Sequence, residues 1–362
     1  MITVSLCMIV KNEEEVLARC LDSVRDLVDE IVIVDTGSTD GTKEIASRYT
    51  DRIYDFEWIY DFAAARNYSF SLATQDYILW LDADDRLRER DRKLFASLKE
   101  TLDPAVDSVA MEYHLLLDAE GNPAAMSRRN RLVKRSRGYR WHNPIHEYLE
   151  VNGNVYLTDI AVTHDRKGSH SARNLDIFQR MMERDGGLFG RNLLYYGNEL
   201  ADSQRYAEAA EIYEKFLSQP VEYFEDHLLA CSKLAECRHH LGDMEGKLRS
   251  LVRTMEYDIP RADFCCAIGY CYQDRGEIRK AIFWYELALR LEKPLHHFGI
   301  LNLICWTWLP HLQLCICYGL LGELERAYEH NEKALEFLPR DPNLLSNRAK
   351  LLEAMGEGGG PG

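Results

Sequence analysis

The sequence predicts an α/β domain followed by an all-helical repeat domain. The chain has 362 residues, and a single hydrophobic core rarely organises more than about 250–300 residues, so two domains are expected. Residues 1–100 alternate short apolar runs with amphipathic segments, whereas the residues after Ala172 have an almost continuous helical pattern. Hydrophobic residues make up 46% of the chain, which is enough to form a core in each domain.

Four short runs in the first part are typical of strands, because they are rich in β-branched or aromatic residues and are bounded by polar ones. They are Val4–Val10, Glu30–Asp35, Arg52–Phe56 and Tyr77–Asp82. Helical patterns between them start near Asn12, near Asp40 and at about Asp61. Repeated β–α–β units of this length predict a mainly parallel sheet that is covered by helices.

Residues 103–164 have a less regular pattern. Alternating runs at Val109–Leu117, Asn130–Lys134 and Glu147–Val151 predict an antiparallel extension of the sheet. The polar segment Asp165–Ser171 is the expected domain boundary. We therefore assign residues 1–165 to the α/β domain, residues 166–355 to the helical domain and residues 356–362 to a disordered glycine-rich tail.

The helical part contains an internal repeat. When Gly197, Ala235, Gly269 and Cys315 are aligned, successive offsets are 38, 34 and 46 residues, and tetratricopeptide units repeat every 34 or so residues. Small residues recur twelve positions after three of these anchors, and an aromatic residue follows two of them. These residues are Ala209, Ala281, Ala327, Tyr213 and Tyr285. Small residues let paired helices approach closely, so the pattern predicts tetratricopeptide-like repeats. The alternative is a generic helical bundle.

Charge and cysteine content limit the classes of partner and compartment. The net charge of −15 opposes binding to nucleic acid or to an anionic membrane. Ten cysteines occur without a C-x-x-C pair, which predicts buried thiols in a reducing cytoplasm and argues against zinc or a disulfide framework. No secretory signal pattern is expected at the N-terminus. The most apolar stretch, residues 300–309, ends at Pro310 and is too short to cross a bilayer.

One stretch departs from this acidic balance. Ser127–Arg140 contains seven Lys or Arg residues and no acid. Within it, the side chains of Arg128, Arg129, Arg131 and Lys134 are candidates to meet a diphosphate or an acidic acceptor. The alternative is a solvated basic strand.

Carboxylates cluster where the strands end, and in parallel sheets ligands bind beyond the carboxyl ends of the strands. The run Tyr77–Asp85 delivers Asp82, Asp84 and Asp85 to one loop. Because crowded carboxylates repel each other, a hard cation such as Mg²⁺ or Mn²⁺ would relieve the repulsion. The alternative is a solvated acidic turn.

A second strand end offers another carboxylate. Asp35 precedes a Gly/Ser/Thr turn that allows close backbone approach, and its side chain can accept hydrogen bonds from a base or a ribose. The turn has neither the G-x-x-x-x-G-K pattern of a phosphate loop nor G-x-G-x-x-G. The alternative is a helix cap formed by Ser38 or Asp40.

The segment Trp141–Glu147 and the later His164 carry the third group of candidates. Transfer to a nucleophile requires a general base, and the side chains of Glu147 and His146 can serve. His164 ends a strand and can ligate a metal through an imidazole nitrogen. The alternative is that these histidines have structural roles.

Four ordered motifs carry a specific resemblance. They are Ser5–Glu14, Val34–Thr42, Asp61–Asn67 and Leu81–Asp85. In this order the chain closely resembles family 2 glycosyltransferases, which have the GT-A fold, a Rossmann-like fold that binds nucleotide-sugars. The resemblance covers residues 3–165. The fused tetratricopeptide-like repeats make the whole chain similar to sublancin-type peptide S-glycosyltransferases.

This resemblance implies roles for residues at matching positions. The loop Val10–Glu13, with Asn12 and Glu13, would bind the nucleoside together with Asp35. The side chains expected to line the same pocket are those of Asp61, Arg66 and Asn67. Asp82 would face the ribose and the metal, and Asp84 would ligate the metal with His164. Thr36 stands where many relatives have a second acid. The identity of the nucleobase in the donor is therefore left open.

The expected function is that of a metal-dependent, inverting hexosyltransferase. It would use Mn²⁺ or Mg²⁺ and a nucleotide-sugar, with a UDP-sugar expected, and would modify a peptide or protein acceptor at a Cys or Ser side chain. Stacked helical repeats form concave surfaces that suit extended peptides, and they also offer a surface for homodimerisation. Two alternatives remain: an enzyme with a glycan or lipid acceptor, and a noncatalytic scaffold.

Overall fold

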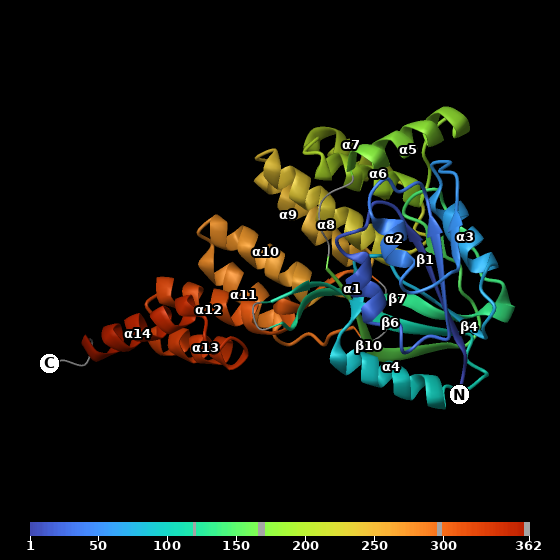
Figure 1. The fold of residues 1–362 in the computed structure, drawn as a ribbon. Helices are drawn as coiled ribbons and strands as arrows, with labels where there is room; N and C mark the ends of the chain where they lie inside the picture. Colours follow the sequence, from blue (N-terminus) through green and yellow to red (C-terminus); the bar gives the residue numbers. More distant parts are fainter. Residues whose placement is uncertain (119–120, 166–170, 295–298, 358–362) are drawn as a thin grey trace. The chain divides into compact units, whose positions relative to one another are not determined.

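The protein divides into two compact units. The computed structural model describes residues 1–118, 121–165, 171–294 and 299–357. The first unit comprises Met1–Leu116 and Met126–Gly187, and the second comprises Leu117–Ala125 and Leu188–Gly362. The first is α/β and the second is helical, which confirms the predicted fold class (Figure 1). Helix α5 (Ser171–Asp185) belongs to the first unit.

The exact domain limits stay a prediction. Most of the expected boundary segment, residues 166–170, lies outside the described residues. Helix α14 (Pro342–Glu357) reaches into the first two residues of the expected tail, and residues 358–362 lie outside the described part of the chain.

One sheet organises the α/β unit. Its eight successive strands are β3 (Ile53–Asp55), β2 (Glu30–Asp35), β1 (Val4–Val10), β4 (Tyr77–Trp80), β7 (Pro123–Lys134), β6 (Ser108–Leu117), β10 (Val155–His164) and β5 (Asp85–Leu87). Strands β1 to β4 are parallel, as expected. Because Val10 pairs with Asp35 at the last position of the β1–β2 register, the loops after both strands leave the sheet at the same edge.

The prediction of an antiparallel extension was wrong in part. Strand β7 runs antiparallel to β4, and β5 runs antiparallel to β10, but β10 is parallel to β6. The run Glu147–Val151 does not join the main sheet: β9 (Tyr148–Leu149) pairs with β8 (Trp141–His142) in a separate two-stranded sheet. Short alternating runs identify strands but do not determine their partners.

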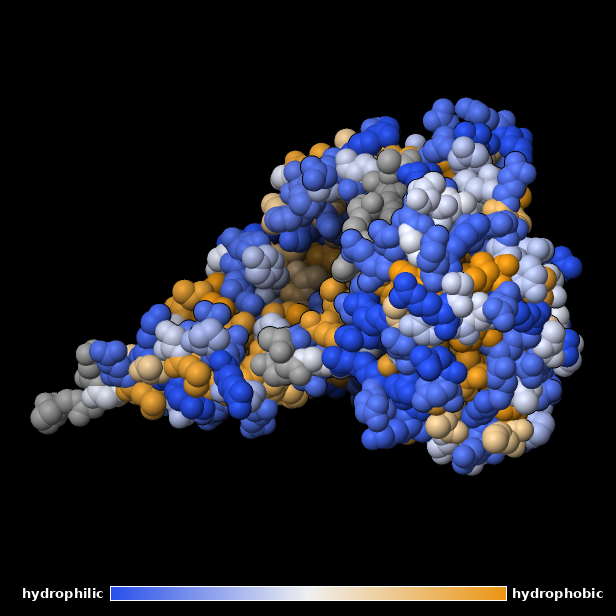
Figure 2. Space-filling view, viewed as in Figure 1, coloured by the Kyte–Doolittle hydropathy of each residue, from blue (hydrophilic) through white to orange (hydrophobic). Residues whose placement is uncertain are grey.

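The two faces of the sheet are covered by different helices. Leu6 and Met8 of β1 belong to a core that also contains residues of α1 (Leu17–Asp22), α2 (Thr42–Ala46) and α4 (Glu89–Thr101). Cys7, between them in sequence, belongs to a smaller apolar cluster with residues that flank and form α3 (Phe62–Ser71). This alternation is the period-two pattern of a strand with both faces buried. The outer surface around α1, α2 and α4 is mostly hydrophilic (Figure 2).

The first helix begins later than the sequence suggested. Asn12 has a φ of 57°, in the left-handed region, and α1 begins only at Leu17. The three glutamates after Asn12 therefore lie in the loop before the helix rather than in its first turn. Glu13 lines the cavity described below, and Glu14 Oε2 accepts the Gly41 N–H at 2.8 Å.

The second unit consists of successive helices in contact with each other. They are α6 (Arg191–Asp202), α7 (Tyr206–Leu217), α8 (Phe224–His240), α9 (Met244–Arg253), α10 (Ala262–Asp274), α11 (Ile278–Ala288), α12 (Trp308–Leu320), α13 (Leu324–Phe337) and α14. A short strand β11 (Leu301–Asn302) and a 3₁₀ turn at Leu303–Trp306 lie between α11 and α12, and another 3₁₀ turn lies at Thr254–Glu256. A further 3₁₀ turn, at Arg135–Arg137, belongs to the first unit. Among the described helices, none is both long and apolar enough to cross a membrane.

Two helix pairs share the same close contact. A Cβ atom added to Gly197 of α6 would lie 2.7 Å from the Tyr213 ring of α7, and one added to Gly269 of α10 would lie 2.8 Å from the Tyr285 ring of α11. Both tyrosines are buried. The small residue and the aromatic residue of the repeat pattern therefore fit one another, which explains why both recur.

The turns within the helix pairs follow the same spacing. Gln204, Gly242, Gly276 and Gly322 have φ values of 61°, 76°, 73° and 74°, and they are separated by 38, 34 and 46 residues. These are the offsets of the sequence anchors. Three of the four positions have glycine, the residue that adopts this conformation without a steric penalty.

All ten cysteines are free thiols, and all are buried. This confirms the expectation of buried thiols. They come from both units: Cys7 and Cys20 lie in the α/β unit, and the other eight lie in the helical unit.

The turn geometry predicts opposite effects for two reciprocal substitutions. Gln204 and Gly276 are both exposed, and each backbone N–H donates to the carbonyl three residues earlier. A side chain in the left-handed region costs ~1 kcal/mol. Gln204→Gly should therefore raise the free energy of unfolding by about 1 kcal/mol, and Gly276→Gln should lower it by about the same amount. Denaturant titration monitored by circular dichroism measures both. Changes of the same sign would contradict the shared turn geometry.

Candidate active site

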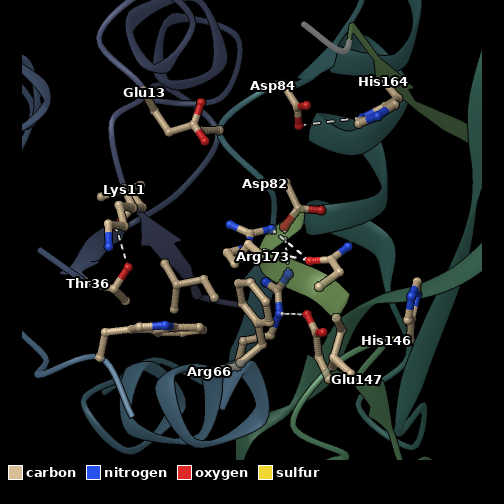
Figure 3. Close-up of a pocket in the computed structure, with 17 residues that line it drawn as sticks. Lys11, Glu13, Thr36, Arg66, Asp82, Asp84, His146, Glu147, His164 and Arg173 are labelled. Carbon is tan, nitrogen blue, oxygen red and sulfur yellow. Dashed lines mark hydrogen bonds and ion pairs between the residues drawn. The ribbon is translucent and has the colours of Figure 1, made fainter. Parts of the chain in front are cut away.

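A cavity of about 350 Å³ lies in the first unit, where the loops after the parallel strands meet (Figure 3). It is lined by Ile9, Val10, Lys11, Glu13, Thr36, Trp58, Phe62, Arg66, Asp82, Ala83, Asp84, Ile145, His146, Glu147, His164, Arg173 and Asn174. Eight predicted site residues are among them: Val10, Glu13, Arg66, Asp82, Asp84, His146, Glu147 and His164. The topology thus brings together residues that are up to 154 positions apart in the sequence.

Arg66 of α3 connects two carboxylates. Its Nη2 atom donates to Asp82 Oδ1 at 2.7 Å, and its Nε atom donates to Glu147 Oε1 at 2.6 Å. The guanidinium also lies over the rings of Trp80 and Trp141, 5.1 and 4.8 Å from their centroids. Burial alone would lower the pKa of Arg66, but the two carboxylates outweigh it and raise that pKa. Arg66 is therefore a permanent cation held in one orientation.

Around Glu13 and Asp84, by contrast with the surroundings of Arg66, negative charge is in excess. Burial and, to a smaller extent, the carboxylates of Asp84 and Asp82 together raise the pKa of Glu13 to about 7, against the opposing influence of Arg173. Burial also raises the pKa of Asp84, and the Asp82 and Asp85 carboxylates add to the effect against the opposing influence of His164. This part of the cavity therefore has more negative charge than its own cations compensate.

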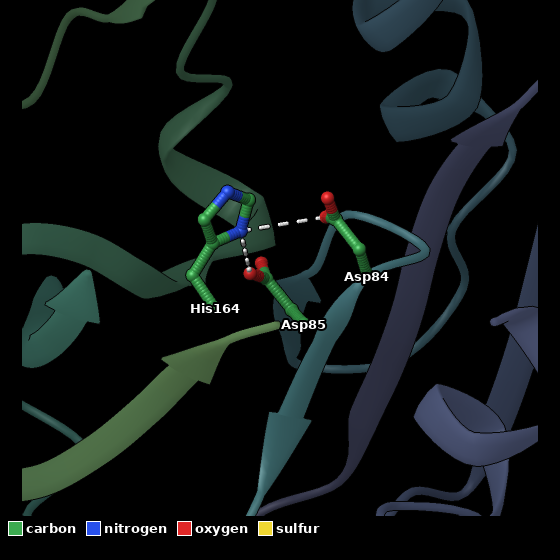
Figure 4. A group of neighbouring side chains, drawn as sticks. All are labelled: Asp84, Asp85 and His164. Atoms are coloured by element: carbon green, nitrogen blue, oxygen red, sulfur yellow. Dashed lines mark ion pairs between the residues drawn. The ribbon is translucent and has the colours of Figure 1, made fainter. Parts of the chain in front are cut away.

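Asp84, Asp85 and His164 form a compact group of possible metal ligands (Figure 4). One ligand atom from each lies within 4.8 Å of the others. The Nδ1 atom of His164 is 3.5 Å from Asp84 Oδ1 and 3.4 Å from Asp85 Oδ1, and it also hydrogen-bonds to the Tyr113 hydroxyl at 2.8 Å. Asp85 Oδ1 is buried and makes no hydrogen bond within the described part of the chain. A buried carboxylate oxygen without a hydrogen bond is available to a cation, and the group as a whole offers the oxygen and nitrogen donors that such a cation binds.

The structure differs from the sequence prediction in the choice of second carboxylate. Asp82 and Asp84 were the expected pair; in the structure Asp85 lies beside Asp84 and His164, and one oxygen of Asp82 is bound by Arg66. The metal role of Asp82 stays a prediction. Asp85 is in turn fixed by Arg131 of β7, whose Nη2 atom lies 3.0 Å from Asp85 Oδ2. Both side chains are almost completely buried, so Arg131 is a support for this group rather than an exposed basic residue.

The two candidate bases are adjacent in the loop after β8. Glu147 is held through Oε1 by Arg66. His146 has a φ of 49°, and its ring stacks 6.1 Å from that of Phe178 of α5. The same loop is tied to α3, because the Pro144 carbonyl accepts a hydrogen bond from the Phe62 N–H. Both side chains line the cavity (Figure 3).

Four predicted site residues do not line the cavity. Asn12 Oδ1 accepts the Thr39 N–H at 2.8 Å, which holds the first loop against the second. Asp61 caps α3 by accepting the Ala64 N–H, and the side chain of Asn67 both donates to and accepts from the backbone of Trp141. Asp35 accepts the N–H groups of Gly37 and Ser38 through Oδ1, but its buried Oδ2 has no hydrogen-bond partner among the described residues.

Several lining residues were not identified from the sequence. Arg173 of α5 contributes a positive charge near Glu13 and lies over the Phe62 ring, 4.8 Å from its centroid. Trp58 packs edge-on against the same ring at 4.7 Å. Arg173 follows the expected domain boundary and belongs to no motif, so only the fold reveals it. Trp58 could have been suspected from its position just before the Asp61–Asn67 motif, which itself contains Phe62.

Comparisons with known proteins identify a different family in each of the two parts of the chain. Residues 5–143 match the model of glycosyl transferase family 2, and residues 262–294 match a tetratricopeptide repeat. A TPR repeat-containing protein of Synechococcus elongatus is 29% identical over 344 residues, which cover 94% of this chain and 76% of that protein.

Several relatives are named as glycosyltransferases, among them proteins of Bacillus subtilis and Rhizobium meliloti. The SPbeta prophage-derived glycosyltransferase SunS of Bacillus subtilis is 27% identical over 295 residues, or 74% of this chain and 65% of the relative. The lipopolysaccharide core biosynthesis glycosyltransferase LpsC of Rhizobium meliloti is 32% identical over 158 residues, or 42% of this chain and 58% of the relative. Residues 5–143 are therefore a glycosyltransferase domain of family 2, and residues 262–294 are a tetratricopeptide repeat.

Proposed function

We propose that the chain transfers a sugar from a nucleotide-sugar, with a UDP-sugar expected, and that the transfer depends on Mn²⁺ or Mg²⁺. The observation that supports this most directly is the acidic half of the cavity. Asp84, Asp85 and His164 offer donor atoms close together, and burial, with the nearby Asp82 and Asp85 carboxylates, raises the pKa of Asp84. A bound divalent cation supplies the positive charge that stabilises a departing nucleoside diphosphate.

The chain's own residues would place the donor around this point. Asp35 lies outside the cavity lining, but its Oδ2 has no hydrogen-bond partner among the described residues and is an acceptor suited to an N–H or hydroxyl group of the nucleoside. Asp82 is oriented by Arg66 towards the ribose, and Arg173 brings a cation to the cavity for the diphosphate. Trp58 and Phe62 add apolar surface beside these polar groups.

Metal-dependent nucleotide binding is the first test. UDP with Mn²⁺ should raise the melting temperature of the full chain clearly, and UDP with a chelator should raise it only weakly, because a ligand at 100 times its Kd stabilises the native state by about 2.7 kcal/mol. Asp84→Asn should remove the Mn²⁺-dependent part. Asp159→Asn is the matched control, since Asp159 is an exposed acid paired with Arg90. Equal stabilisation in the chelator would show that the metal has no role.

We also propose that Glu147 or His146 is the general base for an inverting transfer. Glu147 keeps one carboxylate oxygen beyond the one bound by Arg66, and His146 presents an imidazole to the same cavity. The two roles are separable, because Glu147 also orients Arg66, with its Oε1 atom 2.6 Å from Arg66 Nε.

Substitution of the base should slow transfer far more than donor binding. His146→Asn and Glu147→Gln are compared for the kcat of sugar transfer and for the Kd of UDP with Mn²⁺. The base is the residue whose substitution lowers kcat by about 10²–10⁴-fold with an unchanged Kd. Glu147→Gln is expected to weaken UDP binding as well if its role is to hold Arg66. Near-normal transfer by both variants would exclude both residues as the base.

For the acceptor, we propose a peptide or protein, modified at a Cys or Ser side chain. The support is the repeat unit, which contains a cavity of about 250 Å³ with Lys247 and the exposed Tyr270 among its lining residues. A mixed aromatic and charged surface on stacked helices suits an extended peptide. The second candidate is a glycan acceptor, which the similarity to LpsC favours.

The two acceptors predict different results for a change in the repeats. With a peptide acceptor, Tyr270→Ala should raise the acceptor KM about tenfold, while hydrolysis of the donor by water stays unchanged. Phe337→Ala is the control, because Phe337 is similarly exposed and does not line this cavity. Cys- and Ser-containing peptides are assayed beside a core oligosaccharide. Transfer to the oligosaccharide with no effect of Tyr270→Ala would favour the glycan acceptor instead.

A further inference from the structure

The α/β unit has a second cavity, of about 480 Å³, that shares no lining residue with the candidate active site. It is lined by residues of α3, including Phe70 and Ser71, and by residues of segment 134–140. Its buried floor consists of Ala73, Ile78 and Val133. Phe70 and Tyr139 pack against the same apolar cluster. The interior of this cavity is therefore largely apolar and aromatic.

The entrance carries an unusual concentration of positive charge. Of the seven basic residues in Ser127–Arg140, three are paired with acids: Arg128 with Glu112, Arg131 with Asp85 and Arg137 with Asp107. The three that line this cavity are Lys134, Arg135 and Arg140. Within the described ranges, none of these three side chains forms an ion pair with a carboxylate. In a chain with a net charge of −15, three such cations around one cavity require an explanation.

The contacts of these three side chains leave their charges available. Lys134 donates to the Pro104 carbonyl, and Arg135 Nε donates to the Gln75 carbonyl at 2.6 Å. Hydrogen bonds from Thr3 lower the pKa of nearby Asp76, and the charges of Arg135 and Lys134 lower it further, but the Asp76 carboxylate bonds to Thr3 and not to the two cations. Arg140 is exposed.

We propose that this cavity binds a sugar that carries a phosphate group. Its volume suits a ligand of one or two sugar rings. Phe70 and Tyr139 offer apolar surface for the C–H face of a ring, and the cations offer charge-assisted hydrogen bonds to the phosphate. A free phosphate would leave the apolar floor uncovered, and a neutral sugar would make no charge-assisted hydrogen bonds with the cations. The site is separate from the proposed donor site and does not depend on it.

The cavity nevertheless has a structural link to the active site. Asn67 lines it and, through its side-chain amide, holds the backbone of Trp141. Arg66, which directly precedes Asn67 in the sequence, lines the candidate active site. A ligand of the second cavity therefore binds to the helix that positions Arg66.

Calorimetric titration of the full chain in a chelator tests the proposal. The probes are glucose 6-phosphate, glucose, inorganic phosphate and phosphatidylglycerol vesicles. Glucose 6-phosphate should bind at least about tenfold more tightly than glucose or phosphate, and vesicles should not bind. Arg140→Gln should raise its Kd about tenfold, because a charge-assisted hydrogen bond is lost. Arg48→Gln is the matched control, since Arg48 is exposed and does not line the cavity.

Two further variants separate the possible sites and roles. Asp84→Asn alters the donor site and should leave glucose 6-phosphate binding unchanged. Ser71→Trp fills the entrance without changing the charge and should abolish binding while the melting temperature stays near the wild-type value. The proposal is overturned if glucose 6-phosphate binds no more tightly than phosphate, if Arg140→Gln binds it as the wild type does, if Asp84→Asn abolishes binding, or if only vesicles bind.

Discussion

The buried ion pair of Arg131 and Asp85 is the constraint on which the rest of the active site depends. Both side chains are withdrawn from water, so each charge requires the other, and loss of one partner from such a pair costs about 3–5 kcal/mol. The guanidinium of Arg131 also lies over the rings of Trp80 and Tyr113, 3.9 and 4.5 Å from their centroids. Residues of β4, β5, β6 and β7 thereby meet at one cation.

This pair determines where the neighbouring polar groups can lie. Asp85 Oδ2 accepts the Asp82 N–H at 3.0 Å, which fixes the turn between β4 and β5, and Tyr113 holds His164. Asp82 then presents its carboxylate to Arg66. One side of the cavity is therefore electrostatically balanced within the protein, and the other side is acidic. A divalent cation bound to a diphosphate would complement these two sides, because it carries both positive and negative charge.

Much of this organisation could be predicted from the sequence, and the failures have physical causes. The parallel strands and the repeat spacing follow from local patterns, and the acids after β4 were recognised because three of them crowd one loop. Asp85 was not chosen as a metal ligand, since only the pairing of β5 with β10 brings it to His164. Arg131 was interpreted as a basic residue on a strand, because burial beside an acid distant in sequence leaves no local signal. Arg173 reaches the cavity only because α5 packs in the first unit.

The burial of all ten thiols has a practical consequence. Burial raises the pKa of Cys7 to about 12 and that of Cys265 to about 12, so these sulfurs stay protonated and poorly nucleophilic in neutral solution. The folded protein therefore exposes no thiol that would react with maleimides or other alkylating reagents. One cysteine introduced at an exposed position would be the sole reactive sulfur, which makes the natural sequence a ready background for attaching a fluorophore or spin label at a chosen place.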